Sequence, residues 1–172
     1  MLLALLVLGA CGSDGNEDSE FTGNEVRLEL VPGTVEGNTT TGELVIRERN
    51  NGQAQLDIAL QNVLQGASHP VHLHFGSLSD DGEVATFLTT LSEVDGVGRS
   101  STVLSALDDE TPITYSDLTN FNGSIKIHFE ASGPLENEVL GAVNIGLNMA
   151  DNEAYLNGDR SITVCNSDFK NN

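Results

Sequence analysis

Residues 69–75 have the sequence HPVHLHF, in which apolar and histidine side chains alternate from residue 71 onward. Such alternation is typical of a β-strand with one buried face, because successive side chains point to opposite faces of a strand. The segment SIKIHFE at residues 124–130 repeats this pattern and places His128 opposite its apolar side chains. The two segments therefore predict two strands that share a core and carry their histidines on the other face.

The two-residue period continues along most of the chain after residue 24. The predicted strands are 26–31, 44–46, 53–60, 69–75, 83–91, 100–107, 124–130, 139–147 and 160–165. Asn50-Asn51-Gly52 and Asp95-Gly96 separate strands as tight turns, since Asn, Asp and Gly tolerate positive φ. Helical periodicity is limited to one turn near residues 116–118. Short strands with Gly-rich turns predict an all-β fold, an antiparallel barrel or sandwich, as a single domain over residues 24–172.

Composition and charge exclude several classes of protein. The chain has 172 residues and a formal net charge of −19, from 26 acidic and 7 basic side chains. So acidic a surface repels phosphate backbones and anionic headgroups, which argues against nucleic-acid binding and against electrostatic docking on membranes. The presence of only two cysteines excludes a disulfide scaffold. Cys165 lies in a predicted strand and is interpreted as a half-buried apolar side chain.

The N-terminal residues predict attachment to a membrane. Residues 1–10 include an apolar run too short to span a bilayer and are predicted to be a signal peptide. Leu8-Gly9-Ala10-Cys11 resembles a bacterial lipobox, although no Lys or Arg precedes the apolar run. Residues 11–23 then comprise the lipidated Cys11 and an acidic tether. We expect a lipoprotein of the bacterial cell envelope, anchored by lipid at the outer membrane and facing the periplasm or the cell surface.

Three of the four histidines are predicted to point to the same face of the sheet, where they can bind one metal ion. His72 and His74 are two residues apart on one strand, so their Cα atoms lie about 6.6 Å apart. A third imidazole, from His128 on an adjacent strand, completes a three-coordinate site, and imidazole ligands suit copper or zinc. The alternative is that these outward histidines are ordinary solvated positions of a sheet.

Two segments resemble the Cu/Zn superoxide dismutase family. Residues 56–76, LDIALQNVLQGASHPVHLHFG, are similar to its strand, Gly-containing turn and His-x-His-x-Phe-Gly element. Residues 123–147, GSIKIHFEASGPLENEVLGAVNIGL, are similar to the strand with the last copper histidine, the loop after it and the closing strand. The CHRD (chordin-type) domain has a related pattern. The resemblance implies a Greek-key antiparallel β-barrel or sandwich of the dismutase type.

The resemblance also implies roles for the histidines. His72, His74 and His128 match the copper ligands of the family, and His69 matches a structural histidine. Bound Cu(II) needs a fourth ligand, for which His69, water or a carboxylate is a candidate. Residues 77–127 contain no histidine, so the family's bridging ligand and zinc site are absent and zinc is not expected.

The expected function is copper binding by a membrane-anchored barrel, with copper as cargo or as a slow redox centre. The family carries an Arg just before its closing strand, where residues 134–139 contain two acids and no Arg. Efficient dismutation is therefore not expected, and the net charge also slows the arrival of an anion. The alternative is a metal-free CHRD-type surface or adhesion module, and an active superoxide dismutase is the third and least favoured function.

Lipidation predicts a membrane affinity that depends on one residue. Wild-type protein should enter the detergent phase of a phase-separation assay, and Cys11→Ala should move it to the aqueous phase, because the acyl chains supply the membrane affinity. Cys165→Ala is the matched control and should leave the partition unchanged. Wild-type protein in the aqueous phase would contradict the predicted lipid anchor.

Overall fold

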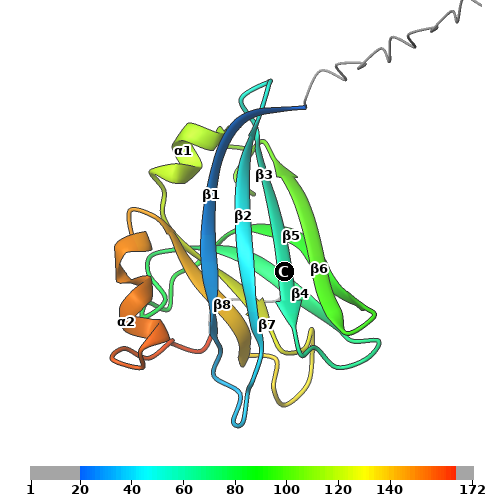
Figure 1. The fold of residues 1–172 in the computed structure, drawn as a ribbon. Helices are drawn as coiled ribbons and strands as arrows, with labels where there is room; N and C mark the ends of the chain where they lie inside the picture. Colours follow the sequence, from blue (N-terminus) through cyan, green and yellow to red (C-terminus); the bar gives the residue numbers. More distant parts are fainter. Residues whose placement is uncertain (1–19, 166–172) are drawn as a thin grey trace, which may run out of the picture.

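Eight antiparallel strands close into a barrel in the computed structural model, which describes residues 20–165 (Figure 1). The strands are β1 (Phe21–Pro32), β2 (Thr41–Arg49), β3 (Ala54–Gln61), β4 (Ser68–Phe75), β5 (Val84–Val94), β6 (Val97–Leu104), β7 (Asn122–His128) and β8 (Val139–Gly146). Around the barrel they follow the order β1-β2-β3-β6-β5-β4-β7-β8, with β8 paired to β1. The prediction of an all-β antiparallel barrel is confirmed.

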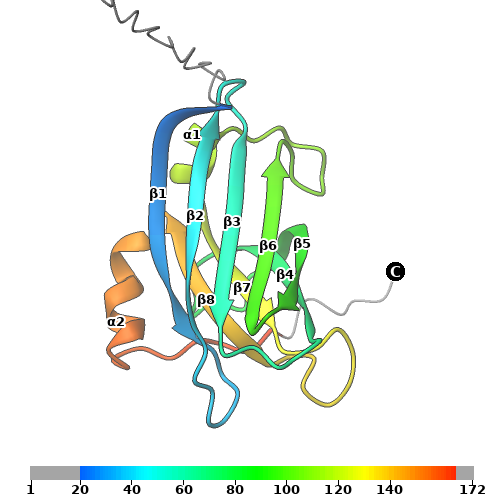
Figure 2. The same ribbon diagram turned by 45° about the vertical axis from the view of Figure 1, so that its right-hand side comes forward.

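The order of the strands around the barrel differs from their order in the chain. β4, β5 and β6 are consecutive neighbours and β7 returns to lie beside β4, the arrangement that defines a Greek key. Two junctions are short: β5 pairs with β6 only between residues 92–94 and 97–99, and β1 pairs with β8 only at Val31 and Pro32. The barrel is therefore flattened into two four-stranded sheets, and Figure 2 shows one of them, β1-β2-β3-β6, strand beside strand. A closer likeness to the dismutase barrel stays a prediction.

The core lies between these two sheets and follows the predicted alternation. Every second side chain of the central strands points inward and is buried. These inward side chains include Leu44, Ile46, Leu56, Ile58, Leu60, Val71, Leu73, Ile125 and Ile127. Because the period of a strand is two, this inward set fixes the residues between them on the outer face of the barrel.

Tight turns hold the register that separates the two faces. Asp95 (φ 55°) and Gly96 (φ 82°) form a two-residue turn between β5 and β6, with both residues in the left-handed region that a type I′ hairpin requires. Gly52 (φ 81°) supplies the left-handed residue of the turn between β2 and β3. Both turns lie where the sequence predicted them.

The N-terminal boundary differs from the prediction. β1 begins at Phe21, within the stretch expected to be tether, and Phe21 pairs with Arg49 of β2. The predicted signal peptide and Cys11 lie outside the described residues. Within residues 20–165, no helix is long and apolar enough to cross a membrane.

The C-terminal part of the described chain corrects the prediction of a strand at 160–165. The helices are α1 (Tyr115–Thr119), near the expected turn, and the unpredicted η1 (Met149–Asp151) and α2 (Asn152–Leu156), whereas residues 161–165 are irregular. Each strand of the closed barrel already has two neighbours, so no edge remains for a ninth strand.

Residues 161–165 lie instead on the outside of the barrel, where Ile162 and Cys165 join a second apolar cluster with Val31, Leu78, Val139, Ala142 and Tyr155. Cys165 is buried, with 1% of it exposed, rather than half-buried as the sequence predicted.

The facing of β7 can be tested by a single substitution. Ile127 is fully buried in the core, so Ile127→Asp places a carboxylate among apolar side chains and should lower the free energy of unfolding by more than about 3 kcal/mol. Ile127→Val removes one methylene and should cost only about 1 kcal/mol. Urea denaturation of the three proteins measures both effects. An Asp variant as stable as the wild type would mean that Ile127 faces outward and His128 inward.

Candidate metal centre

The three histidines predicted to bind metal lie together on the outer face of two adjacent strands. His72 and His74 belong to β4, and His128 is the last residue of β7. β4 and β7 are antiparallel neighbours in which His72 pairs with Lys126 and His74 with Ser124. Since the side chains between them fill the core, the imidazoles project away from it. Strand period and strand pairing thus bring all three histidine side chains to one face of the barrel.

The distances within this group fit one metal ion. One ligand nitrogen from each histidine lies within 4.8 Å of the others. The ring centroids of His72 and His128 are 4.5 Å apart, and those of His74 lie 5.9 Å from His72 and 6.2 Å from His128. Imidazole nitrogens bind a metal at about 2.0 Å, so small side-chain rotations bring the three into contact with a common ion. The residues of this group can therefore hold a metal ion.

All three imidazoles are buried, which corrects the expectation of solvent-facing surface histidines. The exposed fractions are 5% for His72, 1% for His74 and 0% for His128. Segments outside the strands cover the outer face of β4 and β7: the β4–β5 loop (residues 76–83), the β7–β8 loop (residues 129–138) and residues 161–165. Alternation places a side chain inside or outside a barrel, but it carries no information on the loops that close over it.

Two of the rings are oriented by backbone carbonyls of these loops. Nδ1 of His74 lies 3.0 Å from the Gly82 carbonyl oxygen, and Nδ1 of His128 lies 3.1 Å from that of Glu136. A carbonyl oxygen only accepts, so Nδ1 of each ring must donate its proton. Nε2 of each neutral ring then carries the lone pair. Metal-binding histidines are commonly held in this way, with one nitrogen bonded to a carbonyl and the other directed to the metal.

Phe87 of β5 was not singled out from the sequence, but it contacts this group. It pairs with His72 across the strands, and its ring meets the imidazole edge-on at 4.7 Å with an interplanar angle of 79°. The other side of Phe87 faces solvent, because 59% of the residue is exposed. Phe87 lies in the predicted strand 83–91 next to Leu88, which faces the core, so alternation alone would have placed Phe87 on the outer face. Phe87 therefore shields His72 from water.

His69 does not join the three histidines. It is buried, and its Nδ1 lies 3.1 Å from the His128 carbonyl oxygen and 2.7 Å from that of Phe129. By the same reasoning Nδ1 of His69 donates to these carbonyls and fixes the end of β7. His69 thus acts on the position of His128 through the backbone, and the structure does not bring it into the group as a fourth ligand.

Lys126 is a buried cation beside the histidines. Only 1% of it is exposed, and its Nζ donates to the carbonyl oxygens of Asp80 at 3.3 Å and Thr163 at 3.1 Å. The Asp80 carboxylate accepts hydrogen bonds from the N–H and the hydroxyl of Ser77, which lower its pKa below the ordinary value, and the charge of Lys126 lowers that pKa further. Lys126 therefore links the β4–β5 loop to residues 161–165.

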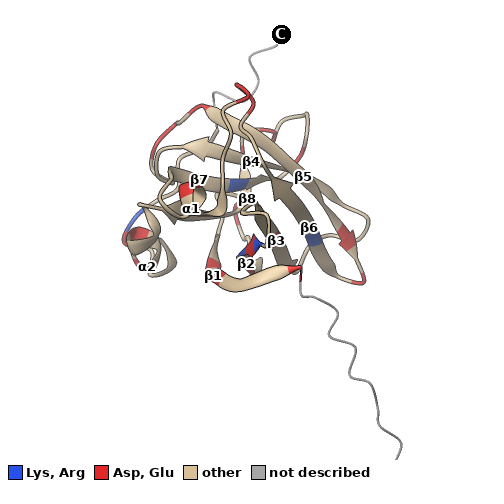
Figure 3. Ribbon diagram, turned by 90° about the horizontal axis from the view of Figure 1, so that it is seen from above, with Lys and Arg blue, Asp and Glu red and all other residues tan. Residues whose placement is uncertain are grey.

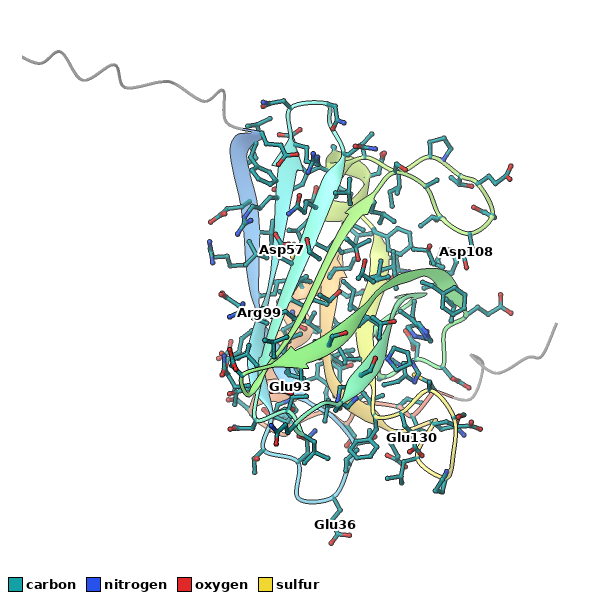
Figure 4. All side chains as sticks on the ribbon, turned by 90° about the vertical axis from the view of Figure 1, so that its right-hand side faces the viewer. Glu36, Asp57, Glu93, Arg99, Asp108 and Glu130 are labelled. Atoms are coloured by element: carbon teal, nitrogen blue, oxygen red, sulfur yellow. The ribbon has the colours of Figure 1, made fainter. Side chains whose placement is uncertain are left out.

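The basic side chains Arg27, Arg47 and Arg99 lie away from the histidines. Figure 3 shows acidic residues distributed around the molecule and few basic ones. Arg27 and Arg47 pair with acids of β1, β2 and β3, and with Arg99 they line a groove of about 590 Å³ formed by β1, β2, β3, β6 and part of β5. Arg99 lies on the opposite side of the molecule from Glu130, which follows β7 (Figure 4). In the described part of the chain, Lys126 is thus the basic residue closest in sequence to the proposed ligands.

The chain was compared with family models, with curated proteins and with solved structures, and none of them matches. The resemblance of residues 56–76 and 123–147 to Cu/Zn superoxide dismutases therefore stays an interpretation of the sequence.

Proposed function

We propose that this protein binds copper through His72, His74 and His128. The observation that carries the proposal is the convergence of three buried imidazoles from β4 and β7 with ligand nitrogens within 4.8 Å of one another. Imidazole nitrogen is a good ligand for copper, and the group contains neither a carboxylate nor a thiolate among the described residues. A structural zinc site has four protein ligands as a rule, whereas Cu(I) accepts three; three imidazoles also hold zinc in catalytic sites that keep one position open, so titration with both metals distinguishes the two.

The chain's own residues contribute orientation and exclusion of water. The Gly82 and Glu136 carbonyls hold the rings of His74 and His128 in one tautomer, and His69 fixes the backbone of His128. Phe87 covers His72. Bound copper supplies one-electron redox chemistry. A buried three-imidazole site suits storage or transfer of copper as cargo, or slow electron transfer.

Efficient dismutation of superoxide is not part of this proposal. Superoxide is an anion, and a net charge of −19 opposes its approach unless a local basic patch attracts it. Among the described residues, the basic side chain beside the group is Lys126, and its ammonium is directed to two backbone carbonyls. We also propose that lipid on Cys11 anchors this copper-binding barrel at the outer membrane.

Removal of each proposed ligand should abolish tight copper binding. Calorimetric titration should show that His72→Ala, His74→Ala and His128→Ala each lower copper affinity more than about 100-fold, since even residues behind the ligands typically contribute 10–100-fold. His69→Gln retains a side-chain donor and should lower affinity by about tenfold or less. Circular dichroism confirms that each variant is folded.

The same titration has a clear adverse outcome. Equal copper affinity in wild type and His128→Ala would show that β4 and β7 do not form one site. The metal-free CHRD-type surface module would then be the better interpretation.

A further inference from the structure

The irregular segment 161–165 makes several specific hydrogen bonds to other parts of the fold. We call it the strap. The N–H of Thr163 donates to the Leu78 carbonyl at 2.9 Å, and its hydroxyl donates to the Ser79 carbonyl at 2.8 Å. The N–H of Cys165 donates to the Asn137 carbonyl at 3.1 Å. The strap is therefore bonded to the β4–β5 loop at one point and to the β7–β8 loop at another.

These attachment points lie beside the carbonyls that orient the imidazoles. In the β4–β5 loop, Leu78 and Ser79 precede Gly82, which accepts from His74. In the β7–β8 loop, Asn137 follows Glu136, which accepts from His128. The strap thus joins the two loops that hold two of the three proposed ligands.

Two further contacts fasten the strap to the barrel. The buried ammonium of Lys126 donates to the carbonyl oxygen of Asp80 in the β4–β5 loop and to that of Thr163 in the strap. From the side, Ile162 and Cys165 pack in the outer apolar cluster against Leu78 and Val139. An ammonium with 1% exposure is costly to bury, so the two carbonyls it bonds must stay in place.

We propose that the strap, with Lys126 as its anchor, holds the two loops over the histidine group, orients His74 and His128, and limits exchange of the bound ion. The limit on ion exchange rests on the proposed copper site. The orientation of His74 and His128 rests on the hydrogen bonds described above. Lys126 and Thr163 are positioning residues in this account, since they act on the ligands through Gly82 and Glu136. Opening the strap should release both orienting carbonyls together.

The metal-free protein provides the first test. In wild type, NMR should show slowly exchanging Nδ1–H protons of His74 and His128 and protected amides of Thr163 and Cys165. Lys126→Met keeps the apolar stem but removes the charged hydrogen bonds, and these four protons should then exchange at least about tenfold faster. Thr163→Val removes only the hydroxyl and should give a smaller increase at the same protons.

Two controls separate opening of the strap from loss of stability. Arg27→Ala removes an exposed ion pair with Glu25 of β1, away from the strap, and should leave all four protons unchanged. The core amides of β3 should exchange at wild-type rates in every variant. If Lys126→Met and Thr163→Val leave the Nδ1–H exchange of His74 and His128 unchanged, the strap does not orient them and the proposal is wrong.

The copper-loaded protein provides the second test. Excess bicinchoninate, which chelates Cu(I), should extract Cu(I) at least about tenfold faster from Lys126→Met than from wild type, and at the wild-type rate from Arg27→Ala. Equal rates in wild type and Lys126→Met would overturn the role of the strap in ion exchange. Failure of wild type to bind copper would contradict the proposed function, while the exchange measurements on metal-free protein would still decide whether the strap orients the histidines.

Discussion

The antiparallel pairing of β4 with β7 is the constraint on which the rest of this structure depends. In this register, Val71 and Leu73 face the core beside Ile125 and Ile127, as the closely packed interior of the barrel requires. A strand has a period of two, so a slip of one residue would expose all of these apolar side chains. The same register that protects the core therefore brings the histidines of the two strands together on the outer face.

Loops that lie far apart in the sequence convert this outer face into a buried site. A buried imidazole is stable only when its N–H is hydrogen-bonded, and the carbonyls of Gly82 and Glu136 meet that need for His74 and His128. The same bonds leave Nε2 of each ring as the nitrogen with a lone pair. The covering loops thus provide both the burial and the choice of tautomer, and Lys126 ties one of them to the strap.

The sequence correctly predicted the features that depend on a local pattern of residues. It failed for the features that depend on contacts between distant segments. Alternation gave the facing of the histidines, and Asp95-Gly96 gave a turn whose two residues both need positive φ. The strand expected at 160–165 was wrong, because closure of the barrel removes every free edge, which no local pattern records. The burial of the histidines was also beyond a local analysis, because the loops that cover them show no alternation, and the contacts of Lys126 and Phe87 join segments far apart in the sequence.

The central claim is that three imidazoles from two strands bind one copper ion. X-ray absorption at the copper edge of the loaded protein tests it most directly, because the outer-shell scattering of imidazole carbons identifies histidine ligands and permits a count. The account predicts a spectrum that fits three imidazoles in wild type and two in His128→Ala. A first shell of oxygen ligands without imidazole scattering, or the same spectrum in both proteins, would contradict it.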